Sequence, residues 1–139
     1  MTIKIKKINN NAKIPFYAHL GDAGMDLYST ETIDLLPENI QLCKTGVAME
    51  IPDGNFGLIK ERSSLGKIGI IVPGGVIDSG YRGEIIVMLY NHGKNMIKIN
   101  AGERIAQLII IPVASPELVE VRELNNSKRG DGGFGSTGK

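Results

Sequence analysis

A second cysteine, a surplus of either charge and a long apolar run are all missing from this sequence. Because Cys43 stands alone, the chain cannot form an internal disulfide, which fits a reducing compartment, and we expect Cys43 to be a small buried residue. The 16 basic and 15 acidic residues leave a net charge of +1, so a broad cationic face for nucleic acid or a membrane is excluded. No apolar run reaches the roughly 18 residues of a membrane span, and the opening residues alternate where a signal peptide would be continuously apolar. These absences predict a soluble, intracellular, cytoplasmic protein.

Apolar and polar residues alternate along most of the chain, as they do in β-strands. The expected strands, rich in Ile and Val, are 3–8, 40–51, 56–61, 84–90, 96–99, 104–113 and 118–124. No window of eleven or more residues carries a convincing helical stripe, and the best helical candidate is a short turn at 63–67. Many short strands predict an all-β sandwich, jelly roll or barrel over residues 1–124. Residues 125–139 would form a glycine-rich C-terminal arm.

The segment LIIIPV (108–113) is apolar on both faces of its expected strand. In a small antiparallel domain the second face must be covered by something. A neighbouring subunit is one candidate, and a strand enclosed within the monomer is the alternative. The sequence pattern alone favours neither.

Residues 73–85 carry the first candidate catalytic group. Asp78 precedes the turn signal Ser79-Gly80, and apolar alternation resumes at Glu84, so we predict a β-hairpin with Asp78 and Tyr81 near its tip. A carboxylate at the apolar edge of a pocket can accept a proton from water, which makes Asp78 a candidate general base. The alternative is that Asp78 only stabilises the turn through an Asx hydrogen bond.

Two polar loops are candidates for anion binding. Arg62, Ser63 and Ser64 are consecutive and can surround a phosphate together with nearby main-chain N–H groups. The alternative is an ordinary strand end with a surface salt bridge. Asp22 and Asp26 lie four residues apart, and we expect one of them to orient an arginine and Asp22 to form a turn. Two carboxylates are a weak basis for a metal site, and the histidines lack zinc-ligand spacing.

The segment RGDGGFGSTGK (129–139) contains five glycines, which offer no side chain to a packed core. Arg129 supplies charge, Ser136 and Thr137 add donors, and Phe134 can stack on a planar ring. This composition predicts a flap over a ligand that has phosphates at one end and an aromatic base at the other.

Five short motifs follow one another along the chain: AGMDLYS (23–29), ERSSLG (61–66), GGVIDSGYRG (74–83), GERIAQLII (102–110) and RGDGGFGSTG (129–138). In this set and order the chain resembles the trimeric dUTPase family across nearly its whole length. The resemblance implies a β jelly roll that forms a homotrimer, with active sites at subunit interfaces, the arm closing over another subunit's site, and strand 108–113 at the threefold axis. It also implies a dUTP diphosphatase that makes dUMP and pyrophosphate, which limits uracil incorporation into DNA and supplies dUMP for dTMP synthesis.

The resemblance assigns roles in catalysis and in recognition of the nucleoside. Asp78 would activate a water molecule for attack on the α-phosphorus, and Tyr81 would pack on the deoxyribose and leave no room for a 2′-hydroxyl. Main-chain groups of the hairpin would read uracil at Gly75, Val76, Ile77 and Ile86.

The resemblance also assigns residues to the triphosphate. The phosphates would be contacted by Arg62, Ser63, Ser64 and Gln107, and Asp26 would support this cluster. From the arm, Arg129, Ser136 and Thr137 would reach the γ-phosphate, Phe134 would lie over uracil, and Gly135 would turn its amide inward. Mg²⁺ would be held through the triphosphate and water, with no direct protein ligand.

Two positions depart from the family pattern. Val72 stands where some members carry an asparagine that contacts uracil, so base recognition here relies more on the main chain. Ser64 is often glycine in dUTPases and resembles the related dCTP deaminases, but the deaminase glutamate that transfers protons is replaced here by Met88, which cannot act as an acid or base. A dCTP deaminase-related enzyme and a dUTPase-like nucleotide-binding or regulatory trimer are the alternative interpretations.

Overall fold

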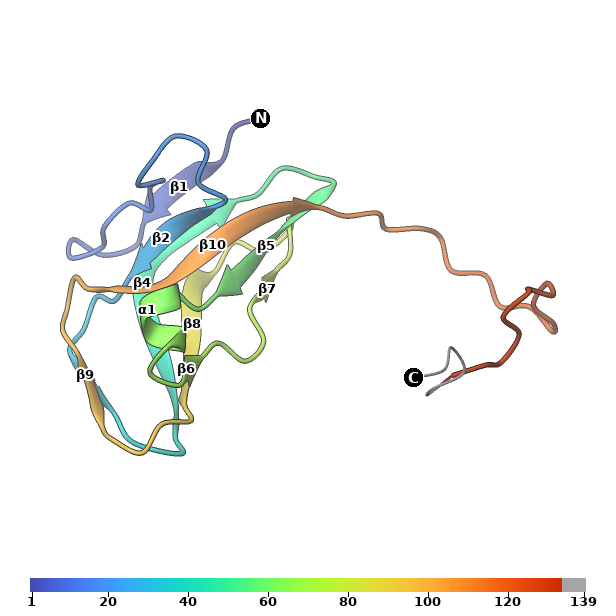
Figure 1. The fold of residues 1–139 in the computed structure, drawn as a ribbon. Helices are drawn as coiled ribbons and strands as arrows, with labels where there is room; N and C mark the ends of the chain where they lie inside the picture. Colours follow the sequence, from blue (N-terminus) through green and yellow to red (C-terminus); the bar gives the residue numbers. More distant parts are fainter. Residues whose placement is uncertain (134–139) are drawn as a thin grey trace.

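The computed structural model describes residues 1–133, and these form an all-β domain with one short helical turn (Figure 1). In chain order the elements are β1 (Lys4–Lys7), β2 (Gly24–Tyr28), β3 (Ile33–Leu35), β4 (Ile40–Glu50), β5 (Asn55–Lys60), α1 (Ser63–Gly66), β6 (Ile70–Ile71), β7 (Val76–Ile77), β8 (Glu84–Asn91), β9 (Ile97–Ile99) and β10 (Arg104–Pro112). The predicted all-β class is confirmed, and the expected helical turn is present as α1. No helix in the described part of the chain is long and apolar enough to cross a membrane.

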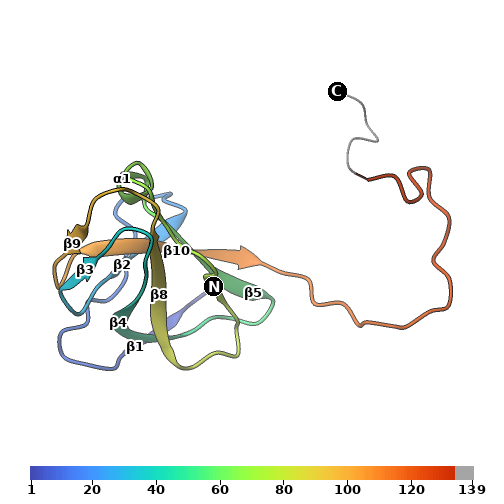
Figure 2. The ribbon, with the colours of Figure 1, turned by 90° about the horizontal axis from the view of Figure 1, so that it is seen from below.

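Two four-stranded antiparallel sheets build the domain. The first has the strand order β1-β4-β8-β6 and the second the order β2-β10-β5-β7, while β3 and β9 form a separate pair. Figures 1 and 2 show the sheets as two layers, with the β3–β9 ribbon at one end of the domain. Of the polar motifs predicted from the sequence, 23–29 and 102–110 fall largely on β2 and β10, whereas 61–66 and 74–83 lie mainly in the segments that follow β5 and β7.

The core lies between the two sheets. Along β8, Ile85, Val87 and Leu89 are fully buried and alternate with half-buried neighbours, and Leu27 and Leu108 of the second sheet join them in one cluster. Full burial of an aliphatic side chain of this size contributes roughly 1.5–3 kcal/mol. The packing of these two faces therefore holds the loops of the domain in fixed positions.

Cys43 lies on β4 with its side chain fully buried, as predicted. Burial raises the pKa of its thiol to about 12, and the charge of Glu31 adds a smaller effect in the same direction. The thiol therefore stays protonated at neutral pH and behaves as a small apolar side chain.

The strand expected at 118–124 is wrong for the described chain. Residues 113–133 contain no strand and extend away from the two sheets (Figures 1 and 2). Leu118, Val119, Val121 and Leu124 are all exposed, so their alternation has no packing partner within residues 1–133. A strand needs a neighbouring strand to satisfy its main-chain groups, and none lies beside this segment.

The expected β-hairpin around residues 73–85 is also wrong in its pairing. β7 pairs with β5 at Gly57 and Leu58, whereas β8 pairs with β4 and β6, so the strands on either side of the turn belong to different sheets. The turn itself is present, because the Tyr81 N–H donates to the Asp78 carbonyl at 3.1 Å. Residues 78–83 therefore form a bridge from one sheet to the other.

The doubly apolar segment 108–113 falls on β10, which lies between β2 and β5. Leu108 is fully buried, and Ile110 packs against the edge of the core. Ile109 and Ile111 are half-buried. Coverage of the second face by a neighbouring subunit stays a prediction.

Candidate active site

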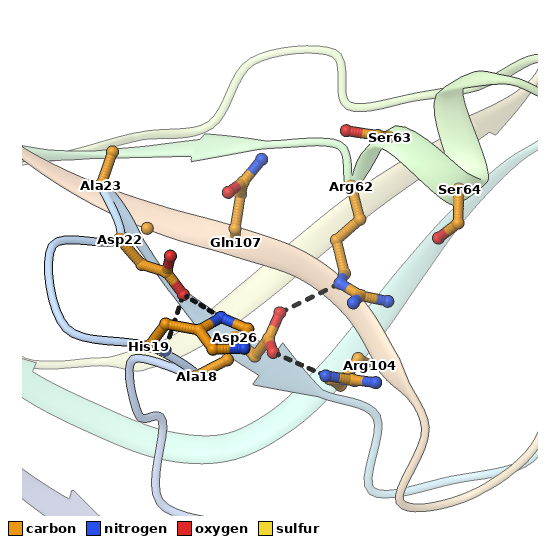
Figure 3. A pocket seen from close by; sticks show the side chains of 11 residues that line it. Ala18, His19, Asp22, Ala23, Asp26, Arg62, Ser63, Ser64, Arg104 and Gln107 are labelled. Carbon is orange, nitrogen blue, oxygen red and sulfur yellow. Dashed lines mark hydrogen bonds and ion pairs between the residues drawn. The ribbon is translucent and has the colours of Figure 1, made fainter.

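A pocket of about 390 Å³ opens between the second sheet and α1 (Figure 3). We call it the arginine pocket, and its lining residues are Ala18, His19, Asp22, Ala23, Gly24, Asp26, Arg62, Ser63, Ser64, Arg104 and Gln107. β2, the start of α1 and β10 contribute most of the polar side chains. The structure thus brings together the five residues outside the arm that the resemblance assigned to the phosphates and their support, Asp26, Arg62, Ser63, Ser64 and Gln107.

Asp26 lies at the centre of the arginine pocket. Its carboxylate accepts a hydrogen bond from Arg62 Nε at 3.0 Å and another from Arg104 Nη1 at 3.2 Å (Figure 3). The Asp26 side chain is only 11% exposed, so these charge-assisted bonds lie in a partly dry environment. Two guanidinium groups around one carboxylate leave one excess positive charge, which suits an anionic ligand.

Arg62 follows the end of β5 and uses only its Nε in binding Asp26. Its two terminal nitrogens donate no hydrogen bond to any described residue, so they can bind a second acceptor. Ser63 and Ser64, at the start of α1, line the same pocket, and in Figure 3 the Ser63 hydroxyl points away from the Arg62 guanidinium. These groups together can bind the oxygens of a phosphate chain.

Gln107 enters the pocket from β10, opposite Asp26 in the strand register. Its Nε2 donates to the Glu61 carbonyl at 3.1 Å, which fixes the direction of the amide. A Cβ at Gly24 would lie 2.6 Å from Gln107 Oε1, so any side chain at position 24 would displace the Gln107 amide from its present position.

Arg104 is the site residue that the sequence reasoning missed. In a regular strand, residues 104 and 107 would point to opposite faces. The pairing register shifts between Arg104 and Ala106, because Arg104 lies opposite Tyr28 and Ala106 opposite Leu27. This bulge turns Arg104 toward the same pocket as Gln107, and a regular alternation could not have predicted it.

Two further polar residues that line the pocket, His19 and Asp22, contact each other within one turn of the chain. Asp22 accepts a hydrogen bond from the His19 main-chain N–H at 2.9 Å and closes the turn expected of it. Its carboxylate also lies 3.3 Å from His19 Nδ1. On β2, burial and then the charge of Asp26 raise the pKa of Tyr28, so this phenol adds no charge to the site.

A second, smaller pocket of about 190 Å³ lies beside the bridge between the sheets. We call it the turn pocket, and it is lined by Val76, Ile77, Asp78, Tyr81, Glu84 and Ile86. It therefore gathers most of the residues that the sequence assigned to base, sugar and catalysis. Gly75 lies next to it, with a positive φ of 92° and its carbonyl bonded to the Ile59 N–H at 2.7 Å.

Asp78 presents an exposed carboxylate at this pocket. Within residues 1–133 no group donates a hydrogen bond to that carboxylate, so the Asx turn considered from the sequence does not form. The turn is held instead by Arg82, whose Nη1 donates to the carbonyls of Ser79 and Tyr81. The carboxylate of Asp78 remains available to accept a proton.

The arginine pocket and the turn pocket share no lining residue. β7 pairs with β5 at Gly57 and Leu58, whereas Arg62 follows the end of β5. The four residue steps from Leu58 to Arg62 span roughly 13 Å in an extended chain, and this length separates Arg62 from the point where β7 pairs with β5. On one chain, the arginines and Asp78 thus line separate pockets.

The arm residues are only partly described. Arg129 lines neither pocket, and its Nε donates to the Gly132 carbonyl at 2.9 Å. The other predicted arm contacts, Phe134, Gly135, Ser136 and Thr137, lie outside the described residues. Their roles stay predictions.

Two positions singled out from the sequence lie away from both pockets. Val72 is buried, and Met88 is half-buried on β8. Neither lines the arginine pocket or the turn pocket. Across residues 1–133, no group of three His, Cys, Asp or Glu side chains could hold a metal ion.

Comparison with known proteins assigns the chain to a family. The dUTPase family model matches residues 10–138. A deoxyuridine 5′-triphosphate nucleotidohydrolase of Clostridioides difficile is 45% identical over 139 residues, covering 98% of this chain and 97% of that protein. The dUTPase of Staphylococcus bacteriophage 80alpha, solved with dUpNHpp, superposes with a TM-score of 0.92 at 34% identity, over 99% of both chains. A dUTPase of phage phi11 of S. aureus, described with a structural Mg(II) ion, gives a TM-score of 0.83 at 30% identity, over 88% of this chain and 98% of that one. The fold is therefore the predicted jelly-roll-like one, and the chain belongs to the dUTPase family.

Proposed function

We propose that the protein is a dUTP diphosphatase, which hydrolyses dUTP to dUMP and pyrophosphate. The observation that carries the proposal is a pair of pockets with complementary chemistry. One is cationic and built on Asp26, Arg62 and Arg104, and the other is small and lies beside the free carboxylate of Asp78. Membership of the dUTPase family supports the same substrate. Hydrolysis of dUTP limits uracil incorporation into DNA and supplies dUMP for dTMP synthesis.

The arginine pocket would bind the triphosphate. Arg62 offers its terminal nitrogens and Ser63 and Ser64 their hydroxyls, while Gln107 is oriented from the opposite strand. Hydrolysis of a phosphoanhydride depends on charge neutralisation and in-line placement of the attacking water more than on covalent catalysis. Asp26 supports this by holding both guanidinium groups before the substrate arrives.

The turn pocket would bind the nucleoside. Val76, Ile77 and Ile86 give it apolar walls, and the nearby main chain would read the polar edge of uracil. A base with the wrong hydrogen-bond pattern leaves buried partners unsatisfied, at a cost of about 1–3 kcal/mol each. Tyr81 would lie against the deoxyribose and exclude a 2′-hydroxyl.

Asp78 would act as the general base. A water between its carboxylate and the α-phosphorus loses a proton to the carboxylate as the new P–O bond forms, and pyrophosphate leaves from the opposite side. General base catalysis of this kind typically contributes about 10²–10⁴-fold in rate. The carboxylate has no competing hydrogen bond within residues 1–133, which supports this role.

The water-activating group and the phosphate-binding group must meet at one substrate. Because Asp78 and Arg62 line separate pockets on a single chain, we propose that a site takes its arginine pocket from one subunit and its turn pocket from another. A homotrimer then contains three such sites. The arm, with Arg129 and residues 134–137, would close each of them, and its ordering and release would accompany turnover.

Mg²⁺ would enter with the substrate, held by the triphosphate and water. Asp26 would not be a direct ligand of the metal in this arrangement, because its two carboxylate oxygens already bind Arg62 and Arg104. Mg²⁺ in such sites keeps several waters and binds mainly through phosphate oxygens. When bound, it supplies neutralisation of the charge on the phosphate chain.

The test is to incubate the purified protein with dUTP, dCTP, dTTP and UTP in turn, with Mg²⁺, and to measure pyrophosphate and the identity of the base. Pyrophosphate released from dUTP alone is the expected result. Uracil formed from dCTP would support a deaminase-related enzyme instead. Absence of turnover with every nucleotide would support a binding or regulatory trimer and contradict the proposal.

A further inference from the structure

We propose that Gly83 and Glu84 are positioning residues that set the sugar specificity of the site by holding the Tyr81 ring in place. This inference rests on the proposed function, since it concerns how a deoxyribose is told from a ribose. Neither residue was assigned a role from the sequence. The contacts that carry the proposal all lie within the bridge between the two sheets.

The Tyr81 ring lies directly over Gly83. A Cβ at Gly83 would collide with the Tyr81 hydroxyl oxygen, and it would lie 2.6 Å from Cζ and 3.0 Å from Cε2 of the ring. Non-bonded atoms do not approach this closely, so any side chain at position 83 must displace the ring. Gly83 does not have a positive φ, so its backbone would accept alanine. What the position requires is the absence of a side chain.

Glu84 fixes the outer end of the same ring. The Tyr81 hydroxyl donates to the Glu84 carbonyl at 2.9 Å. Glu84 is itself attached to β4, because its Oε1 accepts a hydrogen bond from the Gly46 main-chain N–H at 2.7 Å. Next to it, the buried Thr45 hydroxyl donates to the Ile85 carbonyl at 2.6 Å. The acceptor that holds the phenol is therefore anchored to the long central strand of the first sheet.

The ring can be displaced without unfolding the domain. Tyr81 is 43% exposed, and the atoms that would clash are at the end of its side chain. A shifted ring no longer presents the same surface to the sugar, whereas the walls that meet the base, Val76 and Ile77, do not depend on it. We therefore expect Gly83→Ala to weaken discrimination against UTP and to leave discrimination against dTTP intact.

The test measures kcat/KM for dUTP, UTP and dTTP in Gly83→Ala, with Gly80→Ala as the matched control. Gly80 lies in the same turn, lacks a positive φ and has open space where a Cβ would go. In Gly83→Ala the ratio of kcat/KM for dUTP to that for UTP should fall by about tenfold or more. The dUTP to dTTP ratio and the melting temperature should match those of Gly80→Ala.

A second pair of variants covers the case in which Gly83→Ala does not fold. Glu84→Ala removes the anchor to Gly46 and should lower the dUTP to UTP ratio, and Glu84→Gln keeps an oxygen acceptor and should restore it. An unchanged dUTP to UTP ratio in Gly83→Ala and Glu84→Ala would overturn the inference, as would an equal loss of both ratios. If the unmodified protein does not hydrolyse dUTP, the proposed function fails, and the inference fails with it. If the unmodified protein prefers dUTP and the variants do too, the inference alone is wrong.

Discussion

Asp26→Asn removes the charge that joins two arginines while keeping the shape of the side chain. An asparagine can still accept one hydrogen bond, but its amide group would face the other guanidinium, donor against donor. A hydrogen bond to a charged group contributes about 1.5–3 kcal/mol, so two such bonds contribute about 3–6 kcal/mol. The side chains of Arg62 and Arg104 are 26% and 46% exposed, so water can replace part of the stabilisation that these two hydrogen bonds contribute. After roughly halving for solvent screening, the expected loss of stability is about 1.5–3 kcal/mol.

The same substitution should impair catalysis more than stability. Without Asp26, Arg62 loses the contact that fixes its guanidinium, and a misplacement of about 1 Å in a positioning group can cost about 10²-fold in rate. The assays are pyrophosphate release from dUTP, for kcat and KM, and calorimetry, which should show a fall in melting temperature of roughly 5–12 °C.

Asp34→Asn on β3 is the matched control for Asp26→Asn. Asp34 is exposed and makes no side-chain hydrogen bond or ion pair with any described residue. Its substitution should leave both measurements unchanged. An Asp26→Asn protein that matches Asp34→Asn in kcat/KM and melting temperature would refute the role of Asp26 as the support of the arginine pocket.

Three further perturbations test other parts of the structure. Asp78→Asn should bind a nonhydrolysable dUTP analogue normally and lower turnover by about 10²–10⁴-fold, and an unchanged rate would show that Asp78 is not the base. Deletion of residues 129–139 should leave a folded trimer of low activity, as judged by light scattering and pyrophosphate release, whereas dissociation would make the arm structural. Because burial raises the pKa of Cys43 to about 12, the native protein should not react with a disulfide reagent at pH 8, and one thiol per chain should react after denaturation. Rapid reaction of the native protein would contradict the burial of Cys43.

The strands that the sequence predicted best are those that bury one face against the core. The alternation in β4 and β8 and the long apolar run in β10 are enough to locate each strand to within a residue or two. β3 (Ile33–Leu35) and β6 (Ile70–Ile71) were missed because two or three residues carry no period. Segment 118–124 was predicted as a strand since alternation shows only that a segment could pair, and it does not supply the partner strand.

Site residues were predicted where a motif placed polar groups side by side. Arg62, Ser63 and Ser64 are consecutive, so they lie close together in any fold of the chain. Arg104 was missed because a bulge in β10 directs its side chain toward the pocket, and no sequence pattern indicated this bulge. The position of Asp78 relative to Arg62 depends on how β7 pairs with β5, and local patterns contain no information on this pairing.

The most direct test of the shared site is complementation between two inactive variants. Arg62→Gln lacks the phosphate-binding group and Asp78→Asn lacks the base, and the two proteins can be unfolded together in equal amounts and refolded into mixed trimers. If each site joins the arginine pocket of one subunit to the turn pocket of another, about a quarter of the sites receive both intact groups, and about a quarter of the normal dUTP hydrolysis should return. If mixed trimers form and show no activity beyond that of the two variants alone, both groups come from the same chain, and the account of the site is wrong.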